Sequence, residues 1–290
     1  MADGTTRSIR VGLIGSGIGA SRTPAMHVQE GRLNGFDYRY DLIDLTVMGL
    51  GVEALPRLLD EAERDGFVGL NITHPCKQAA TQFVDELSAD SAVLGSINTI
   101  TFHNGQRIGH NTDWWGFAQG FRRGLPDARV DRTVLLGAGG AGVAVAHALA
   151  TLGAREVLVS DLDAGRAAAL IDQLSGKHAD CEFRAVTELG AALAGADGLA
   201  HATPTGMAAH PGLPLDTRLL RPDHWIAEIV YFPLETPLLT EAKRLGCRTV
   251  SGGGMAVFQA VGAFQLFTGV VPDTGRMIRH FASLGEGGGI

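Results

Sequence analysis

Short apolar segments alternate with segments of helical length in two successive series, and this alternation restricts the fold more than any other feature of the chain. The first series has three strand-like runs, each followed by a helix-like stretch: 9–14 and 24–33, 38–44 and 52–65, 69–73 and 77–87. A strand, a helix and another strand in that order form a parallel βαβ unit. The first part of the chain is therefore predicted to be α/β, with a mainly parallel sheet.

A β-hairpin is predicted where this series ends. The runs 96–102 and 107–110 flank Asn104-Gly105, and an Asn-Gly pair readily adopts the positive φ angles of a tight turn. We expect this hairpin to close the first domain. An open edge of the first sheet would also make a homodimer compatible with the sequence.

The second series starts after Pro126, and the length of 290 residues favours a second domain here. It comprises the strand-like runs 133–136, 156–160, 198–202 and 225–230, with a glycine loop and a helix over 142–152 after the first run and a helix ending at 174 after the second. These are the parts of a Rossmann-type, doubly wound nucleotide-binding sheet. Two closing helices are predicted after it, over 255–267 and from Pro272-Asp273 onward.

The composition excludes several classes of protein. A formal net charge of −7 and the lack of any Lys and Arg cluster argue against a nucleic-acid or anionic-membrane surface. The three cysteines are far apart, with no CxxC pair and no zinc-type spacing, so no metal is expected and the compartment is predicted to be reducing. The apolar run 11–14 is too short for a signal peptide core or a membrane span. We therefore expect a soluble, cytoplasmic protein.

Two glycine loops compete for a dinucleotide. The loop Gly15-Ser-Gly-Ile-Gly-Ala20 satisfies GxGxxA, which is a weak signal by itself. The loop Gly137-Ala-Gly-Gly-Ala-Gly142 also follows an apolar strand, but it opens a clean helix, and Asp161 ends the next strand about twenty residues later, where an acid can bind a ribose hydroxyl. Small residues let backbone N–H groups approach a pyrophosphate at a helix N-terminus. We place the cofactor at the second loop.

Two polar runs indicate a small polyhydroxylated substrate. Asn71-Ile-Thr-His-Pro-Cys-Lys77 follows a strand, and Asn111-Thr-Asp113 precedes the second series. Together they supply one amine and one carboxylate beside several neutral hydrogen-bonding groups. Amides and hydroxyls can hold a ring, while Lys77 and Asp113 manage the charge as an alcohol gains or loses a proton.

The chain resembles the shikimate dehydrogenase family, and more closely its NAD-dependent quinate/shikimate branch. Besides the two polar runs, the resemblance rests on motifs that occur in family order: Ser21-Arg-Thr-Pro-Ala-Met-His27, Gly95-Ser-Ile-Asn98-Thr, Gly137 to Gly142, Ala202-Thr-Pro-Thr-Gly-Met207, Tyr231-Phe-Pro and Gly252-Gly-Gly-Met-Ala-Val-Phe-Gln259. It implies reversible hydride transfer between NAD(P) and a cyclic hydroxy-carboxylate, shikimate or quinate. It also implies a substrate domain of residues 1–112 and 255–290, to which the closing helices return, and a nucleotide domain of residues 113–254.

The resemblance further implies roles for individual residues. Lys77 and Asp113 would form the catalytic pair, in which Lys77 exchanges a proton with the substrate and Asp113 orients it. The residues implied to bind the substrate are Ser21, Thr23, Asn71, Thr73, Lys77, Asn98, Asp113, Tyr231 and Gln259. Those expected to bind the cofactor are Gly137, Ala138, Gly139, Gly140, Ala141, Asp161, Arg166, Thr203, Met207, Ile229, Gly252 and Met255. Taken alone, Gln259 could be a surface amide, Tyr231 a core aromatic and Met255 an ordinary core residue.

The residues after the second strand favour NAD over NADP. NADP-dependent family members carry Asn-Arg-Thr where this chain has Asp161-Leu162-Asp163. A carboxylate next to a 2′-phosphate costs up to about 4 kcal/mol per unit charge at about 4 Å and an effective dielectric of about 20. Arg166 stands where relatives have a further Arg, so NADP is not excluded.

Three departures from the family pattern leave the substrate range open: Thr23 in place of the second Ser of a Ser-x-Ser pair, His201 where relatives usually have Asn, and Gly253-Gly254 in place of Thr-Arg. One alternative is a diverged paralogue acting on an aminoshikimate-like ring, whose amine would meet Asp41 or Asp44. Another is a non-catalytic ligand sensor, against which the intact Lys77 and Asp113 argue.

Overall fold

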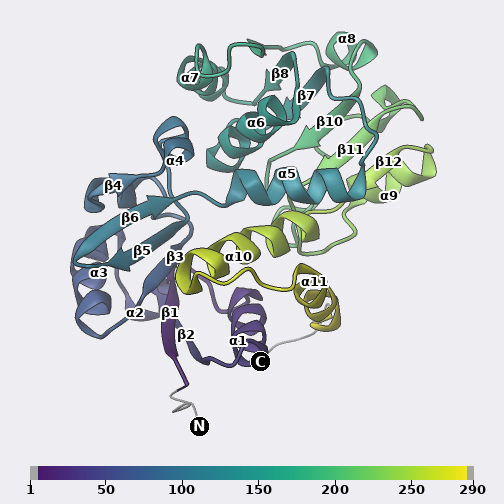
Figure 1. Cartoon of the computed structure of the whole chain (residues 1–290). Helices are drawn as coiled ribbons and strands as arrows, with labels where there is room; N and C mark the ends of the chain where they lie inside the picture. The colour runs from purple at the N-terminus through teal and green to yellow at the C-terminus, as the bar shows by residue number, and fades with distance from the viewer. Residues whose placement is uncertain (1–5, 286–290) are drawn as a thin grey trace. The chain divides into compact units, whose positions relative to one another are not determined.

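A computed structural model of the chain describes residues 6–285, which form two compact units (Figure 1). The first unit comprises Met1–Thr112 and Gln259–Ile290, and the second comprises Asp113–Phe258. The chain therefore crosses between the units twice, once after Thr112 and once within α10 (Gly253–Thr268), which is one continuous helix.

The first unit contains a mixed six-stranded sheet. Its order is β2 (Asp37–Asp44), β1 (Ser8–Gly15), β3 (Gly69–Ile72), β5 (Thr99–His103), β6 (Gln106–His110) and β4 (Glu86–Leu87). β1 is parallel to both β2 and β3, as the βαβ pattern predicts. β5 runs antiparallel to β3 and to β6. The β5–β6 turn has positive φ at Asn104 (51°) and Gly105 (73°), which confirms the predicted hairpin.

Helices pack around the sheet of the first unit, and Figure 1 labels the α-helices among them. They are α1 (Thr23–Leu33), α2 (Leu45–Met48), a 3₁₀ turn (Val52–Ala54) leading into α3 (Leu55–Arg64), a second 3₁₀ turn (Ala79–Phe83), α4 (Ala89–Leu94) and α11 (Thr274–Ser283). Phe264 and Phe267 of α10 pack in one apolar cluster with Ile9 and Val11 of β1. This contact confirms that the closing helices return to the first sheet.

The predicted helix over 77–87 is wrong. The segment forms only the short 3₁₀ turn at Ala79–Phe83, and its end becomes the edge strand β4, parallel to β6. The Asp85 N–H donates to the Arg107 carbonyl oxygen, and the Asp85 carboxylate accepts from the Arg107 N–H at 2.7 Å. Because these bonds are made with a strand distant in sequence, pairing with β6 wins over the local helical pattern.

The second unit contains a fully parallel six-stranded sheet. Its order is β12 (Arg248–Val250), β11 (Trp225–Glu228), β10 (Gly198–His201), β7 (Arg132–Leu136), β8 (Glu156–Ser160) and β9 (Glu182–Ala185). Numbered within the unit, this is the order 6-5-4-1-2-3 of a doubly wound dinucleotide-binding fold. The Rossmann prediction is thus confirmed, although the sequence patterns did not identify β9 or β12.

The helices of the second unit are α5 (Asp113–Gly124), α6 (Gly140–Leu152), α7 (Ala164–Leu174), α8 (Leu189–Ala194) and α9 (Pro237–Arg244), with a 3₁₀ turn at Thr217–Leu219. One buried apolar cluster joins Val134 of β7 and Leu199 of β10 to Leu193 of α8 and Leu238 of α9. The order in which successive strands are added to the sheet reverses between β7 and β10. Doubly wound sheets bind ligands outside the carboxyl ends of the strands at this switch point.

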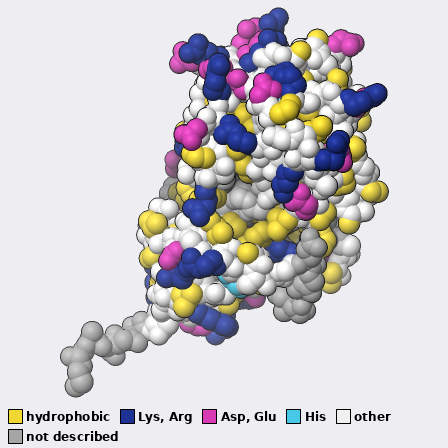
Figure 2. Space-filling view, turned by 90° about the vertical axis from the view of Figure 1, so that its right-hand side faces the viewer, with side chains coloured by type: hydrophobic (Ala, Val, Ile, Leu, Met, Phe, Trp, Pro, Cys, Tyr) yellow, Lys and Arg dark blue, Asp and Glu magenta, His cyan; other side chains and the backbone are white. Residues whose placement is uncertain are grey.

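Charged side chains of both signs share the surface. On the face shown in Figure 2, Lys and Arg are interspersed with Asp and Glu. Within residues 6–285, no helix combines the length and the apolar character needed to cross a membrane. In the same range, His, Cys, Asp and Glu side chains form no group of three or more that could hold a metal ion.

Candidate active site

Several predicted substrate residues lie at one end of the first sheet. β1 and β3 are parallel, so their carboxyl ends coincide, and the antiparallel β5 begins at that same end, where Asn71 pairs with Thr99. Thr73 follows β3, and its N–H donates to the Ile14 carbonyl oxygen at 3.0 Å. The Lys77 carbonyl oxygen accepts from the Ile97 N–H at 2.9 Å. The backbone of Lys77 is therefore held beside the residue that precedes Asn98.

A directed chain of hydrogen bonds fixes the two buried amides. The Tyr40 hydroxyl donates to Asn71 Oδ1 at 2.8 Å, and Asn71 Nδ2 donates to Thr99 Oγ1 at 3.1 Å. The Thr99 hydroxyl in turn donates to Asn98 Oδ1 at 3.0 Å, which also accepts from the Thr112 N–H at 2.8 Å. Asn71 and Asn98 are only 4% and 3% exposed. Such an array can present amide groups to a ligand in fixed orientations.

Ser21 and Thr23 lie at the start of α1. The Ser21 N–H donates to the Ile18 carbonyl oxygen at 3.0 Å, and the Thr23 N–H lies 3.4 Å from Ser21 Oγ. Gln259, on the part of α10 that belongs to the first unit, places its Nε2 3.5 Å from Thr23 Oγ1. The structure thus brings Gln259 together with one of the two hydroxyls predicted to hold the substrate carboxylate.

The first glycine loop uses its amides within the protein. The N–H groups of Gly17 and Ile18 both donate to the Asp44 carboxylate at 2.9 Å. Desolvation raises the pKa of Asp44, but its hydrogen bonds from backbone N–H groups lower it more, so the net pKa lies below the ordinary value. A Cβ at Gly15 would lie 2.3 Å from Thr73 Cγ2. The loop therefore packs against a predicted substrate residue, and a carboxylate of the chain occupies two of its amide donors.

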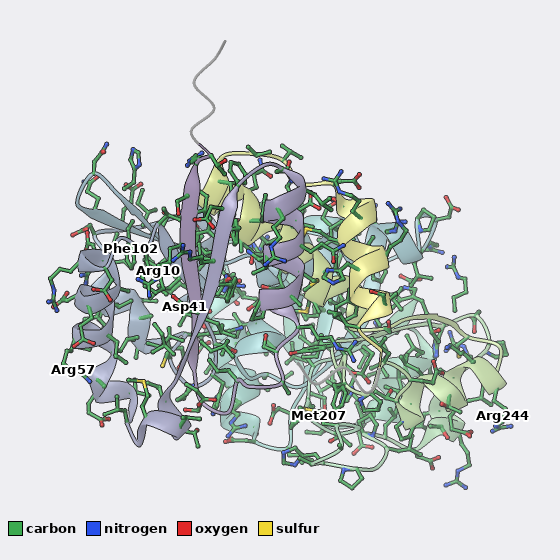
Figure 3. All side chains as sticks on the ribbon, turned by 90° about the horizontal axis from the view of Figure 1, so that it is seen from below. Arg10, Asp41, Arg57, Phe102, Met207 and Arg244 are labelled. Carbon is green, nitrogen blue, oxygen red and sulfur yellow. The ribbon has the colours of Figure 1, made fainter. Side chains whose placement is uncertain are left out.

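Neither carboxylate proposed for an amino-substituted ring is free. Asp44 accepts the two loop N–H groups, and Asp41 pairs with Arg10 across neighbouring strands, with 2.7 Å between Arg10 Nε and Asp41 Oδ2 (Figure 3). The aminoshikimate alternative relied on one of these carboxylates meeting an amine, so the structure gives it no support.

The second glycine loop has the geometry of a pyrophosphate cradle. Gly137 has φ +98°, and a Cβ there would lie 2.7 Å from the Ala202 carbonyl oxygen, so the tight turn requires glycine. A Cβ at Gly142 would lie 2.1 Å from the Gly137 carbonyl oxygen, which shows how closely α6 packs on the loop. Gly139, by contrast, faces open space. These are the three separate roles that glycines have in a dinucleotide-binding turn.

The turn after β8 carries the residues expected to select the cofactor. Asp161 Oδ2 accepts from the Ala138 N–H at 2.7 Å, so its carboxylate lies against the glycine loop. Leu162 is fully exposed. Arg166 Nε lies 3.6 Å from Asp163 Oδ2, and both side chains are more than half exposed. The turn therefore offers two carboxylates and one arginine, which is already paired with one of them.

The remaining cofactor candidates follow the carboxyl ends of other strands. Thr203 comes after β10, Ile229 after β11 and Gly252 after β12. A Cβ at Gly252 would lie 2.2 Å from the Ile229 carbonyl oxygen, so these two loops touch. Met207 lies on the loop after β10 and is 39% exposed (Figure 3). Met255 is in the first turns of α10.

The catalytic candidates come from different units. Lys77 lies in the first unit, whereas Asp113 begins α5 as the first residue of the second. Asp113 directly follows Thr112, which the hydrogen bond to Asn98 anchors. Tyr231 follows β11 in the second unit and is 42% exposed, so it is not a core aromatic.

The sequence interpretation missed three polar residues of the first unit, Tyr40, Thr99 and Thr112, and one of the second unit, Glu228. Tyr40 had a usable signal, since it alternates with Tyr38 along β2 and thus shares its face of the strand. Thr112 lay inside a run already selected for its chemistry. Glu228 ends a buried strand, and the sequence around it carried no sign that a carboxylate there would be fully buried.

Comparison with known proteins identifies the family. Residues 13–100 match the family model described as the shikimate dehydrogenase substrate binding domain. The chain is 55% identical over 282 residues to shikimate dehydrogenase (NADP(+)) of Streptomyces avermitilis, covering 97% of each chain. It is 49% identical over 283 residues to quinate/shikimate dehydrogenase (NAD(+)) of Corynebacterium efficiens, covering 96% of this chain and 99% of the relative.

A solved structure agrees with these sequence matches. Quinate dehydrogenase from Corynebacterium glutamicum in complex with NAD superposes with a TM-score of 0.91 at 46% identity, covering 96% of this chain and all of the other. The chain therefore belongs to the shikimate dehydrogenase family and is an NAD(P)-dependent oxidoreductase.

Proposed function

We propose that the protein catalyses reversible hydride transfer between NAD(P) and the ring alcohol of shikimate, quinate or both. The observation that carries this proposal is the chain of fixed amides, Asn71 and Asn98, at the sheet end where Lys77 is anchored. It suits a small ring with several hydroxyls, and relatives named for these two substrates are 49–55% identical to the chain.

The chain's own residues would manage binding and protons. Ser21 and Thr23 hold the substrate carboxylate, while Asn71, Thr73 and Asn98 bind the ring hydroxyls, with Tyr231 and Gln259 closing over the ring. When bound, the nicotinamide supplies the acceptor or donor of the hydride. Lys77 takes up the proton that the hydroxyl releases as the alcohol becomes a ketone, and returns it in the reverse direction. Asp113 orients the amine and binds a neighbouring hydroxyl.

Initial rates test this function. They would be measured near pH 8.5 with NAD or NADP against shikimate or quinate, by the absorbance of the reduced cofactor. Turnover of at least one ring supports the proposal and shows which ring is preferred. A protein that binds a dinucleotide tightly but turns over neither ring would contradict it and favour a sensor.

The cofactor preference we propose is for NAD, with NADP as a weaker alternative. The preference is supported by Asp161 and Asp163, two carboxylates on the turn after β8 that would repel a 2′-phosphate bound there, and by the exposed Leu162, which offers such a phosphate no charge. Leu162→Arg should raise kcat/KM with NADP relative to NAD by at least about tenfold, since one well-placed charge contributes about 1.4 kcal/mol or more. Leu213→Arg, at another exposed leucine of the second unit, should leave the ratio unchanged.

A homodimer and a cytoplasmic location complete the proposal. β2 forms one edge of the first sheet, so its outer backbone groups are open to pairing with a second chain. Light scattering coupled to size exclusion would measure the mass, and a mass of one chain would contradict the dimer. Cys76, Cys181 and Cys247 carry free thiols, which is typical of a reducing compartment.

A further inference from the structure

A buried histidine–glutamate pair lies at the switch point of the second sheet. His201 ends β10 and Glu228 ends β11, and the parallel register places the two residues opposite each other. His201 is 0% exposed and Glu228 is 1% exposed. A carboxylate and an imidazole withdrawn from water in this way are costly unless every polar atom has a partner.

The Glu228 carboxylate is fully engaged. Both of its oxygens lie 3.0 Å from His201 Nδ1. Oε1 also accepts from the Val230 N–H at 3.1 Å, and Oε2 accepts from the Thr236 hydroxyl at 3.3 Å. Because the carboxylate acts as an acceptor in each contact, His201 Nδ1 carries the proton and donates it to Glu228. The imidazole ring is therefore held in one orientation.

The other ring nitrogen reaches the cofactor side. His201 Nε2 lies 2.5 Å from Thr203 Oγ1, which also accepts from the Thr205 N–H at 3.3 Å. The methyl group of Thr203 lies 2.8 Å from the position that a Cβ on Gly137 would take. Thr203 is thus tied to the buried pair through its hydroxyl and packs on the glycine loop through its methyl group.

We propose that His201, braced by Glu228, is a positioning residue that fixes the Thr203 hydroxyl for contact with the bound dinucleotide. This inference rests on the proposed function. With Nδ1–H given to Glu228, Nε2 accepts the Thr203 proton, one lone pair of Thr203 Oγ1 accepts the Thr205 N–H, and the other lone pair is left for the dinucleotide. Its partner on the cofactor is then a hydrogen-bond donor, either a ribose hydroxyl or the carboxamide N–H₂.

The test is a double-mutant cycle on cofactor affinity. His201→Gln keeps a polar side chain of similar length, but its terminal amide cannot occupy both ring-nitrogen positions that meet Glu228 and Thr203, and Thr203→Val replaces the hydroxyl with a methyl group. Each should raise the Kd for NAD about tenfold, measured by tryptophan fluorescence, while kcat at saturating NAD and the KM of the ring substrate change less than about twofold. Because His201 acts through Thr203, the double variant should bind NAD no more weakly than either single variant. Thr203→Ser should bind like the native chain.

His224→Gln is the matched control. His224 is a second fully buried histidine of the same unit, just before β11, where its Nε2 lies 3.1 Å from the Leu193 carbonyl oxygen. This change should lower the melting temperature as His201→Gln does, but leave the Kd for NAD unchanged. Equal loss of NAD affinity at both histidines would mean a general structural effect and would overturn the positioning role.

Other outcomes are equally decisive. Unchanged Kd values in both single variants, or fully additive losses in the double variant, overturn the positioning role but leave the proposed function intact. A native chain that binds neither NAD nor NADP contradicts both proposals. Titration with 3-acetylpyridine adenine dinucleotide, which lacks the carboxamide N–H₂, identifies the donor: the variants lose their penalty if Thr203 meets the carboxamide and retain it if Thr203 meets a ribose hydroxyl.

Discussion

Lys77 is one of only three lysines in the chain, with Lys177 and Lys243. A general acid or base positioned on the reacting hydroxyl contributes about 10²–10⁴ in rate. Lys77→Ala should therefore lower kcat by about that factor while leaving the Kd for NAD close to native, measured by steady-state rates and fluorescence titration. Lys177→Ala, at an exposed position of the second unit, should keep native rates. Near-normal kcat for Lys77→Ala with substrate bound would remove Lys77 from the proton transfer.

His27 makes the first unit sensitive to acid. It is fully buried among aromatic rings, 2.9 Å from the Tyr38 hydroxyl, and burial lowers its pKa to about 3, an effect that a backbone hydrogen bond at Ala260 only partly offsets. Below about pH 6.5, His27 binds a proton in the unfolded chain, whereas in the folded chain it stays neutral until the pH falls to about 3. The stability that the neutral, buried His27 contributes is therefore fully present above pH 6.5 and is lost as the pH falls toward 3.

Denaturant titrations can isolate this effect. Between pH 7 and pH 5 the His27 linkage should lower the free energy of unfolding by about 2 kcal/mol. His27→Phe should remove that part of the pH dependence, although it lowers stability at pH 7 by leaving the Tyr38 hydroxyl without its partner. His103→Gln, at the exposed end of β5, should keep the native slope. A slope in His27→Phe equal to that of the native chain would show that His27 titrates normally.

The two glycine loops have similar sequences but different proposed functions. Gly19 in the first loop and Gly139 in the second both face open space, and neither has a positive φ angle. A methyl group at Gly139 would occupy the approach of a pyrophosphate, so Gly139→Ala should weaken NAD binding at least about tenfold without loss of melting temperature. Gly19→Ala should keep the native Kd for NAD. The reverse result would move the cofactor to the first loop.

The type of a secondary-structure element could be predicted where it depends on a local sequence pattern. The prediction failed where the strands that pair with the segment lie far away in the sequence. The Asn104-Gly105 hairpin and the strand Glu156–Ser160 follow directly from local residues. The segment 77–87 has a helical pattern, yet its end pairs with β6. In the candidate site, the amides Asn71 and Asn98 were recognisable, but the Tyr40 bond that orients Asn71 depends on the pairing of β2, β1 and β3, which no sequence window contains.

At the scale of the whole molecule, the two units share one uninterrupted helix. α10 begins in the second unit, and its later turns pack on β1 of the first. Unfolding either unit alone would break this helix at the boundary between Phe258 and Gln259. We therefore expect the chain to unfold as a single cooperative transition.

Cofactor binding tests this cooperativity, because all three tryptophans, Trp114, Trp115 and Trp225, lie in the second unit. NAD at about 100 times its Kd stabilises the folded state by about 2.7 kcal/mol. With an unfolding entropy of about 2.1 cal/mol/K per residue, that raises the melting temperature by about 4 °C if all 290 residues unfold together. Tryptophan fluorescence and far-ultraviolet circular dichroism should report this same shift. A shift near 9 °C in fluorescence alone would mean that the second unit unfolds independently and that α10 does not couple the two.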